Sequence, residues 1–295
     1  MKIDAHHHFW RYQPGGFDWI PPQQSELFRD FLPEEFSKEL RSVEFDRSIV
    51  IQARQSLEET RWLLGLADRW PFLAGVVGWV DLCSPEVEAQ IQEFVGHPKF
   101  VGVRHVVRGE PDDFLGRQGF RHGISVLQDY GLVYDLLIFP QHMARAVDLV
   151  ERFPKQVFVL NHLAKPWAGS LSQKVWQEHL RVLANHPNVH AKLTGLVPEG
   201  YPASWSKRDI GFYLDTAFEA FGEGRLMLGS NWPVCLPVGS YSWVLRWILD
   251  YLEGFPSATK EKVWGGNAAT IYRLGLGDSS DSHQTVAGTD GSPVF

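Results

Sequence analysis

The sequence predicts a single (β/α)8 barrel, and three observations favour it. Eight short apolar runs are spaced along the 295 residues, and stretches with helix signals separate them. The runs are rich in Val, Ile and Leu and lack regular polar alternation, which indicates strands buried on both faces. Polar and ionisable residues stand where several of these runs end. Eight strand–helix repeats in one chain are typical of this barrel.

The expected strands are residues 2–8, 46–52, 73–80, 100–107, 132–138, 157–162, 189–195 and 225–231. A doubly wound open sheet is the competing fold, but histidines stand where its Gly-rich phosphate turn would follow the first strand. We therefore expect one barrel domain over residues 1–276. Residues 277–295 have the composition of a C-terminal tail.

Helix signals stand between the runs. Pro33 precedes two glutamates, and Ser56 is placed to cap SLEETRWLLGLADRW at 56–70. Ser, Pro and Glu open a third segment at 84–96, which ends in Gly.

Composition and charge narrow the class of protein. Hydrophobic residues make up 44% of the chain, enough for a sizeable core. The net charge of -7 argues against a nucleic-acid surface, and no apolar stretch reaches the length of a membrane span. Cys83 and Cys235 are too few for a disulfide framework, and no signal peptide is visible. We expect a cytoplasmic protein with a small-molecule partner, no nucleic-acid or membrane partner, and an oligomeric state that the sequence does not indicate.

The first strand carries three consecutive histidines. Side chains alternate along a strand, so His6 and His8 share one face, and Asp4 is expected to share it with them. Two imidazoles on one face can bind one small group between them.

Catalytic residues of such a barrel come from the carboxyl ends of its strands. The polar residues found there are His6, His8, Gln52, Arg104, His105, Asp135, His162, Lys192, Thr194 and Asn231. Burying these groups without partners is costly, so a ring of them is better explained as a site. Asp135 is expected to pair with a basic residue at a neighbouring strand end, whereas Gln52, Lys192 and Thr194 are expected to orient other groups.

Two loops and several aromatic residues are expected near this face. Residues 9–32 and 196–206 form the long connections after the first and seventh strands. The aromatic residues beside strand-end loops would provide a floor or lid for a substrate ring; they are Phe9, Trp10, Trp19 and Trp232. Five histidines in helices or loops are expected on the surface: His97, His122, His142, His179 and His186.

Several motifs resemble the amidohydrolase superfamily. They are Asp4-x-His6-x-His8, His162, and Gly-Ser-x-Trp-Pro at 229–233. Six segments in order resemble its sugar-acid lactonase branch, the L-fuconolactonase and L-rhamnonolactonase-like amidohydrolases: DAHHHFW, FVGVRHVV, VFVLNHLAKP, AKLTGL, LMLGSNWPVC and GGNAATIYRL. The resemblance runs from residue 4 to 274 and implies hydrolysis of a cyclic aldonic-acid ester to the open hydroxy acid.

The resemblance also implies roles for individual residues. One divalent ion, zinc foremost, would be held by His6, His8, His162 and Asn231, where it would activate water and polarise the carbonyl; catalysis without a metal is left open. The catalytic positions would be 231, His162 and His105. The residues that would bind substrate are Arg104, His105, Trp19, Trp232 and Lys165.

Asn231 departs from the pattern of the branch, which has Asp at this position. An amide keeps the shape of the carboxylate but loses its charge and basicity, so the activity of this chain is expected to be impaired. The change is either natural or introduced, and His8 or His162 is the alternative base. Two other functions stay open: a metal-dependent decarboxylase of the same superfamily, and a non-catalytic lactone-binding protein. The sequence does not indicate which sugar is bound.

Overall fold

A computed structural model describes residues 1–107, 109–166, 172–197 and 207–276 of the chain. The eight expected strands all form. They are β1 (Ile3–His7), β2 (Arg47–Ile51), β3 (Leu73–Gly78), β4 (Phe100–Val106), β5 (Val133–Leu137), β6 (Phe158–Leu160), β7 (Val189–Leu193) and β8 (Leu226–Leu228). Their order in the sheet is the order of the sequence, and all seven successive pairs are parallel. This is the predicted (β/α)8 barrel.

The barrel closes between β1 and the segment that follows β8. His8 N donates to the Trp232 carbonyl at 2.7 Å, and Asn231 N donates to the His6 carbonyl at 2.8 Å. Closure therefore uses the histidine run of β1 and the Gly-Ser-Asn-Trp-Pro motif directly.

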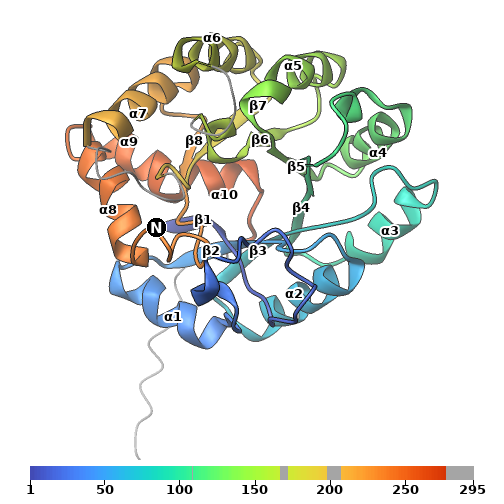
Figure 1. Cartoon of the computed structure of the whole chain (residues 1–295), viewed down its shortest axis with the longest axis horizontal. Helices are drawn as coiled ribbons and strands as arrows, with labels where there is room; N and C mark the ends of the chain where they lie inside the picture. Colours follow the sequence, from blue (N-terminus) through green and yellow to red (C-terminus); the bar gives the residue numbers. More distant parts are fainter. Residues whose placement is uncertain (108, 167–171, 198–206, 277–295) are drawn as a thin grey trace, which may run out of the picture.

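Helices surround the strands (Figure 1). They are α1 (Pro33–Ser42), α2 (Leu57–Arg69), α3 (Val87–Phe94), α4 (Gln118–Asp129), α5 (Met143–Arg152), α6 (Gln173–Ala184), α7 (Lys207–Phe221), α8 (Tyr241–Leu252), α9 (Ser257–Glu261) and α10 (Asn267–Ile271). Ser56 caps α2 as expected, because its Oγ accepts from Glu59 N. In contrast, α3 begins only at Val87, since Ser84 Oγ accepts from Glu86 N in a preceding turn.

Two hydrophobic cores position the site. The larger lies between the strands and the helices, and the smaller fills the barrel at the end that α10 covers. Ile3, Ile49 and Val77 pack there against Ile271 and Tyr272. Because apolar side chains fill this end, the opposite end is left for polar chemistry. No helix in the described ranges is long and apolar enough to cross a membrane.

Two details of the sequence-based expectation are wrong. His142 is buried rather than on the surface, because its Nδ1 accepts from Phe139 N at the turn before α5. Asp4 does not share a face with His6 and His8. The register of β1 against β2 shifts between Asp4 and His7, which breaks the alternation, and Asp4 contacts Ser230 and Tyr241 instead. The expected C-terminal tail, 277–295, lies outside the described residues.

Candidate active site

A cavity of about 500 Å³ lies at the carboxyl ends of the strands. The predicted site residues that line it are His8, Trp19, Arg104, His162, Lys165 and Asn231. Trp19 belongs to the 9–32 loop, which also contributes Gly15, Asp18 and Gln24, so this loop lies at the expected face. Residues 198–206 of the second predicted loop lie outside the described ranges.

The histidines of the site form one cluster. The ring centroid of His6 lies 5.0 Å from that of His8 and 4.6 Å from that of His162. His162 follows β6 in a short 3-10 segment, Asn161–Ala164, at a positive φ of 54°. Residues separated by more than 150 positions therefore meet, as the strand-end argument predicts.

Backbone carbonyls determine which nitrogen of His8 and His162 carries the proton. His8 Nδ1 donates to the Ile51 carbonyl at 2.9 Å, and His162 Nδ1 donates to the Thr194 carbonyl at 3.3 Å. A carbonyl only accepts, so each Nε2 keeps a lone pair. Burial, reinforced by the charge of Arg104, lowers the pKa of His8 to about 3. Burial and the nearby Lys165 hold the pKa of His162 well below its usual range, so both rings are neutral near pH 7.

Arg104 supplies a buried positive charge at the cavity. The residue is 4% exposed, and its Nη2 donates to the backbone and side-chain oxygens of Gln52. Nη1 lies 3.5 Å from His6 Nε2 and 3.5 Å from Asn161 Oδ1. Burial lowers the pKa of Arg104 to about 10, which leaves the group charged at neutral pH. Gln52 orients Arg104, in agreement with the supporting role expected for it.

A buried ion pair supports this arrangement. Lys192 Nζ lies 2.6 Å from Asp135 Oδ2, and neither side chain is exposed. Asn161 Nδ2 and the Tyr272 hydroxyl donate to the same carboxylate. The predicted pairing of Asp135 with a strand-end base is therefore confirmed. The charge of Lys192 is the largest influence after burial that lowers the pKa of His6.

The structure does not bring His105 into the cavity. Consecutive residues of a strand point to opposite faces, so Arg104 and His105 cannot both face the interior. His105 stacks on Phe114, accepts from Trp79 Nε1 at 3.4 Å and donates to Glu110 at 3.0 Å. His105 therefore does not lie among the residues that line the cavity, where its predicted action on substrate would place it, and both of its nitrogens are engaged by Trp79 and Glu110.

Trp232 is also placed elsewhere. Its ring is fully buried and packs against Phe9, Phe31 and Phe36, so it supports the turn after β8. Phe9 and Trp10 are likewise buried, and of the four aromatic residues expected at the substrate only Trp19 lines the cavity.

Sequence reasoning missed several polar residues that line the cavity. Arg54 and Gln55 follow β2, and Glu110 follows β4. Glu59 is not in the lining but holds the Ala53–Arg54 loop, because its carboxylate accepts from both backbone N–H groups. The position of Arg54 just beyond a predicted strand was the available signal.

The described residues do not fit a metal site with three side-chain ligands. In these ranges no three His, Cys, Asp or Glu side chains are placed to hold one ion. His6 Nε2 faces the Arg104 guanidinium, and Asn231 contributes an amide where a carboxylate would bring negative charge. The predicted set of His6, His8, His162 and Asn231 is gathered in one place, because the three rings form a cluster and Asn231 lines the cavity with His8 and His162, but these side chains do not form a ligand group of three in the described ranges.

The fold and the cavity define the class of protein: a (β/α)8-barrel enzyme whose site lies at the carboxyl ends of the strands. The chain belongs to the amidohydrolase family, whose model matches residues 3–274.

Named relatives agree with this assignment. The L-fucono-1,5-lactonase of Burkholderia ambifaria is 34% identical, over 96% of this chain and 99% of the relative. The L-fucono-1,5-lactonase of Burkholderia multivorans is 36% identical, over 93% and 96%. A crystal structure of an amidohydrolase from Burkholderia multivorans with bound zinc has a TM-score of 0.89 and 35% identity, over 93% of this chain and 99% of that one.

Proposed function

We propose that this chain hydrolyses the lactone of a sugar acid of the L-fuconic type to the open hydroxy acid. One observation carries the proposal: His8, His162, Arg104 and Asn231 line one cavity, where two neutral imidazoles adjoin a fixed cation. The two relatives named as L-fucono-1,5-lactonases support the substrate class.

The reaction needs a proton acceptor for water and a positive group for the oxyanion. Water adds to the lactone carbonyl carbon and gives its proton to the Nε2 of His8 or His162. The carbonyl oxygen becomes the oxyanion, which Arg104 stabilises. The bond from the carbonyl carbon to the ring oxygen then breaks, and that oxygen takes the proton from the imidazole. Asn231, on the wall beside His8 and His162, orients the water by hydrogen bonding but does not remove its proton.

We also propose that this hydrolysis proceeds without a bound metal. Arg104 lies against His6 Nε2, and a guanidinium and a divalent cation at one imidazole would repel each other. Elemental analysis of protein purified without chelator, combined with rates before and after chelation, tests this. A rate that falls on chelation and returns with zinc would overturn the metal-free proposal.

The assay is acid release from a panel of aldonolactones, followed with a pH indicator, for the chain and for its Asn231→Asp variant. We expect acid release from L-fuconolactone by both proteins, faster for the variant. Tight lactone binding without acid release by either protein would instead indicate a binding protein. Carbon dioxide release from a hydroxybenzoate would indicate the decarboxylase alternative.

We further propose that the barrel of residues 1–276 is the catalytic domain and that its partner is a small molecule. We also propose that the protein is located in the cytoplasm. Cell fractionation tests the location. Truncation after residue 276 should leave the melting temperature and the lactonase rate unchanged.

A further inference from the structure

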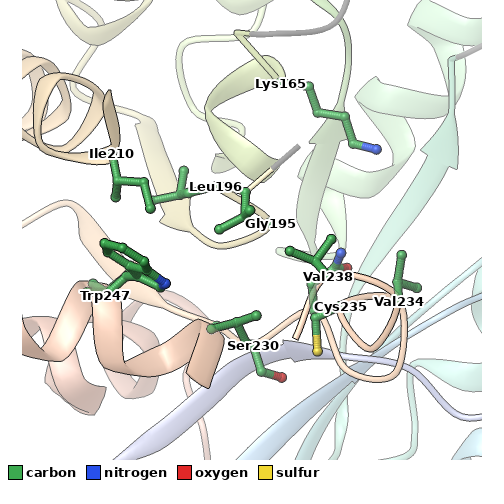
Figure 2. A pocket seen from close by; sticks show the side chains of 14 residues that line it. Lys165, Gly195, Leu196, Ile210, Ser230, Val234, Cys235, Val238 and Trp247 are labelled. Atoms are coloured by element: carbon green, nitrogen blue, oxygen red, sulfur yellow. The ribbon is translucent and has the colours of Figure 1, made fainter. Parts of the chain in front are cut away.

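A second, smaller pocket adjoins the active-site cavity. It has a volume of about 40 Å³ and lies beyond the ends of β7 and β8, against α7 and α8. Figure 2 shows Ile210, Leu196 and Trp247 on one side of it and Val234, Cys235 and Val238 on the other. Lys165, Asn231 and Val234 line both hollows, so the small pocket is a side chamber of the larger one.

Most of the side chains that line this side chamber are apolar. They include Leu196, Val197, Ile210, Val238, Val244, Trp247 and Ile248. Besides Lys165 and Asn231, which it shares with the main cavity, the wall has two polar side chains, Ser230 and Cys235. Ser230 Oγ donates to Asp4 at 2.6 Å and accepts from Trp232 N at 3.0 Å. Burial raises the pKa of the Cys235 thiol, which therefore stays neutral.

The volume limits what the side chamber can hold. One water requires about 10–15 Å³ on the same measure, so 40 Å³ has room for about three such groups. A methyl group fits and a sugar ring does not. An apolar wall also prefers a methyl to a hydroxymethyl group, whose hydroxyl would lose its hydrogen bonds with water.

The side chamber is within reach of a ring bound in the main cavity. Gly195 lines it, and a Cβ at this position would lie 2.8 Å from His162 Nδ1. The Gly195 backbone, at a φ of +55°, lies between the chamber and the Nδ1 side of this imidazole. Asn231, Lys165 and Val234 belong to both linings, so a lactone held against Asn231 can place a ring substituent in the chamber from that side.

We propose that the side chamber binds the terminal methyl group of a 6-deoxyaldonolactone and so sets the substrate preference of the enzyme. This inference rests on the proposed lactonase function and names a structural element that selects among lactones. Val244, on α8, is the wall residue best suited to a test, because a helical side chain has a defined direction.

The experiment uses three lactones of one ring configuration that carry hydrogen, methyl or hydroxymethyl at the same carbon. The values of kcat/KM are measured for the chain, Val244→Phe and Val244→Thr, each also in the Asn231→Asp background. Val244→Phe fills the chamber, whereas Val244→Thr keeps its shape and adds a hydroxyl. Val182→Phe and Val182→Thr, at an exposed position of α6, are the matched controls.

We expect the methyl lactone to exceed the other two by roughly 10- to 100-fold in the chain as it stands. Val244→Phe should bring the methyl-to-hydrogen ratio close to one, and Val244→Thr should raise the hydroxymethyl lactone relative to the methyl lactone. The Val182 variants should keep the original ratios.

Ratios that are unchanged in both Val244 variants, while all three lactones are hydrolysed, would overturn the methyl-site proposal alone. Hydrolysis of none of the three by any protein would instead overturn the lactonase function on which it rests.

Discussion

Asp4 Oδ2 accepts a hydrogen bond from Ser230 Oγ at 2.6 Å, across 226 positions of the chain. Oδ2 also accepts from the Tyr241 hydroxyl, while Oδ1 accepts from Ser230 N and His6 N. One buried carboxyl group thus ties β1 to the turn that carries Asn231. The Asp4 side chain points away from the side chains of His6 and His8. We therefore interpret the aspartate of the Asp-x-His-x-His motif as a residue that positions the turn after β8.

Replacing Asp4 by Leu should destabilise the protein and disturb the site. Two backbone N–H groups would lose their acceptor, at about 1–3 kcal/mol each. We expect a lower free energy of unfolding in urea and a lower kcat, whereas Asp4→Asn, which keeps Oδ1, should lose less of both. Asp148→Leu, at a half-exposed position of α5, is the control. Equal stability of Asp4→Leu and the parent would contradict the positioning role.

Asn231→Asp should raise lactone hydrolysis by a factor of about 100 or more, a gain typical of a well-placed general base. Asn231 and His8 line the same cavity, so a carboxylate there would be placed to take a proton from the attacking water. The rate of the variant should also fall at low pH as the new carboxyl group is protonated. Stopped-flow measurement of acid release checks both effects. Asn185→Asp, at the exposed end of α6, should leave the rate unaltered, and an unaltered rate for Asn231→Asp would remove position 231 from the mechanism.

Arg104 and His105 are consecutive residues that should respond differently to substitution. Arg104→Lys loses the two contacts with Gln52 and the fork that reaches His6 and Asn161, so we expect kcat/KM to fall by about 100-fold or more. His105→Gln should stay within about threefold of the parent, because His105 does not line the cavity and is engaged by Trp79 and Glu110. A loss at His105 comparable with that at Arg104, in a variant of normal melting temperature, would place His105 in the reaction after all.

Acidification should destabilise the fold. Burial holds the pKa values of His6, His7, His8 and His162 below the ordinary value of 6.5, and that of His8 is about 3. Stability from these neutral rings is present above pH 6.5 and is lost as the pH falls towards 3. Asp4 acts in the opposite direction. Burial raises its pKa to about 6, so the stability that the protonated carboxyl group contributes is lost as the pH rises through 6. Glu59, with a pKa of about 7, acts in the same direction as Asp4.

Four imidazoles outnumber these two carboxyl groups, so we expect the melting temperature to fall between pH 7 and pH 4. Calorimetry across this range measures the change. His7→Gln should reduce the slope, whereas His122→Gln, at an exposed position of α4, should not alter it. A melting temperature that rises on acidification would show that the carboxyl groups dominate.

Much of the architecture was predictable from local pattern. Buried parallel strands are short continuous apolar runs, so all eight could be located, with ends displaced by up to three residues. The carboxyl ends of such strands meet at one face, which is why His8, Arg104, His162 and Asn231 could be grouped without coordinates. Ser56 was also recognisable as a cap, because capping depends on neighbours in the chain.

Other features could not be predicted because they depend on contacts between distant segments. Because side chains alternate along a strand, either Arg104 or His105 had to face the barrel interior. The contacts of His105 with Phe114 and Glu110 show that His105 is the one that faces outwards. The register shift in β1 depends on how it pairs with β2, and it sends Asp4 to Ser230. Trp232 resembles an aromatic pocket residue in the sequence, and the rings of Phe9, Phe31 and Phe36 bury it.

The sequence by itself determined the barrel, the face on which chemistry occurs, the family resemblance and the amide at position 231, because periodicity and motif order are properties of neighbouring residues. Only the tertiary structure decided which strand-end side chains share a cavity, which nitrogen of His8 and of His162 carries the proton, and where the side chamber lies. Those features depend on strand register and on side chains from distant segments, which meet only when the barrel closes.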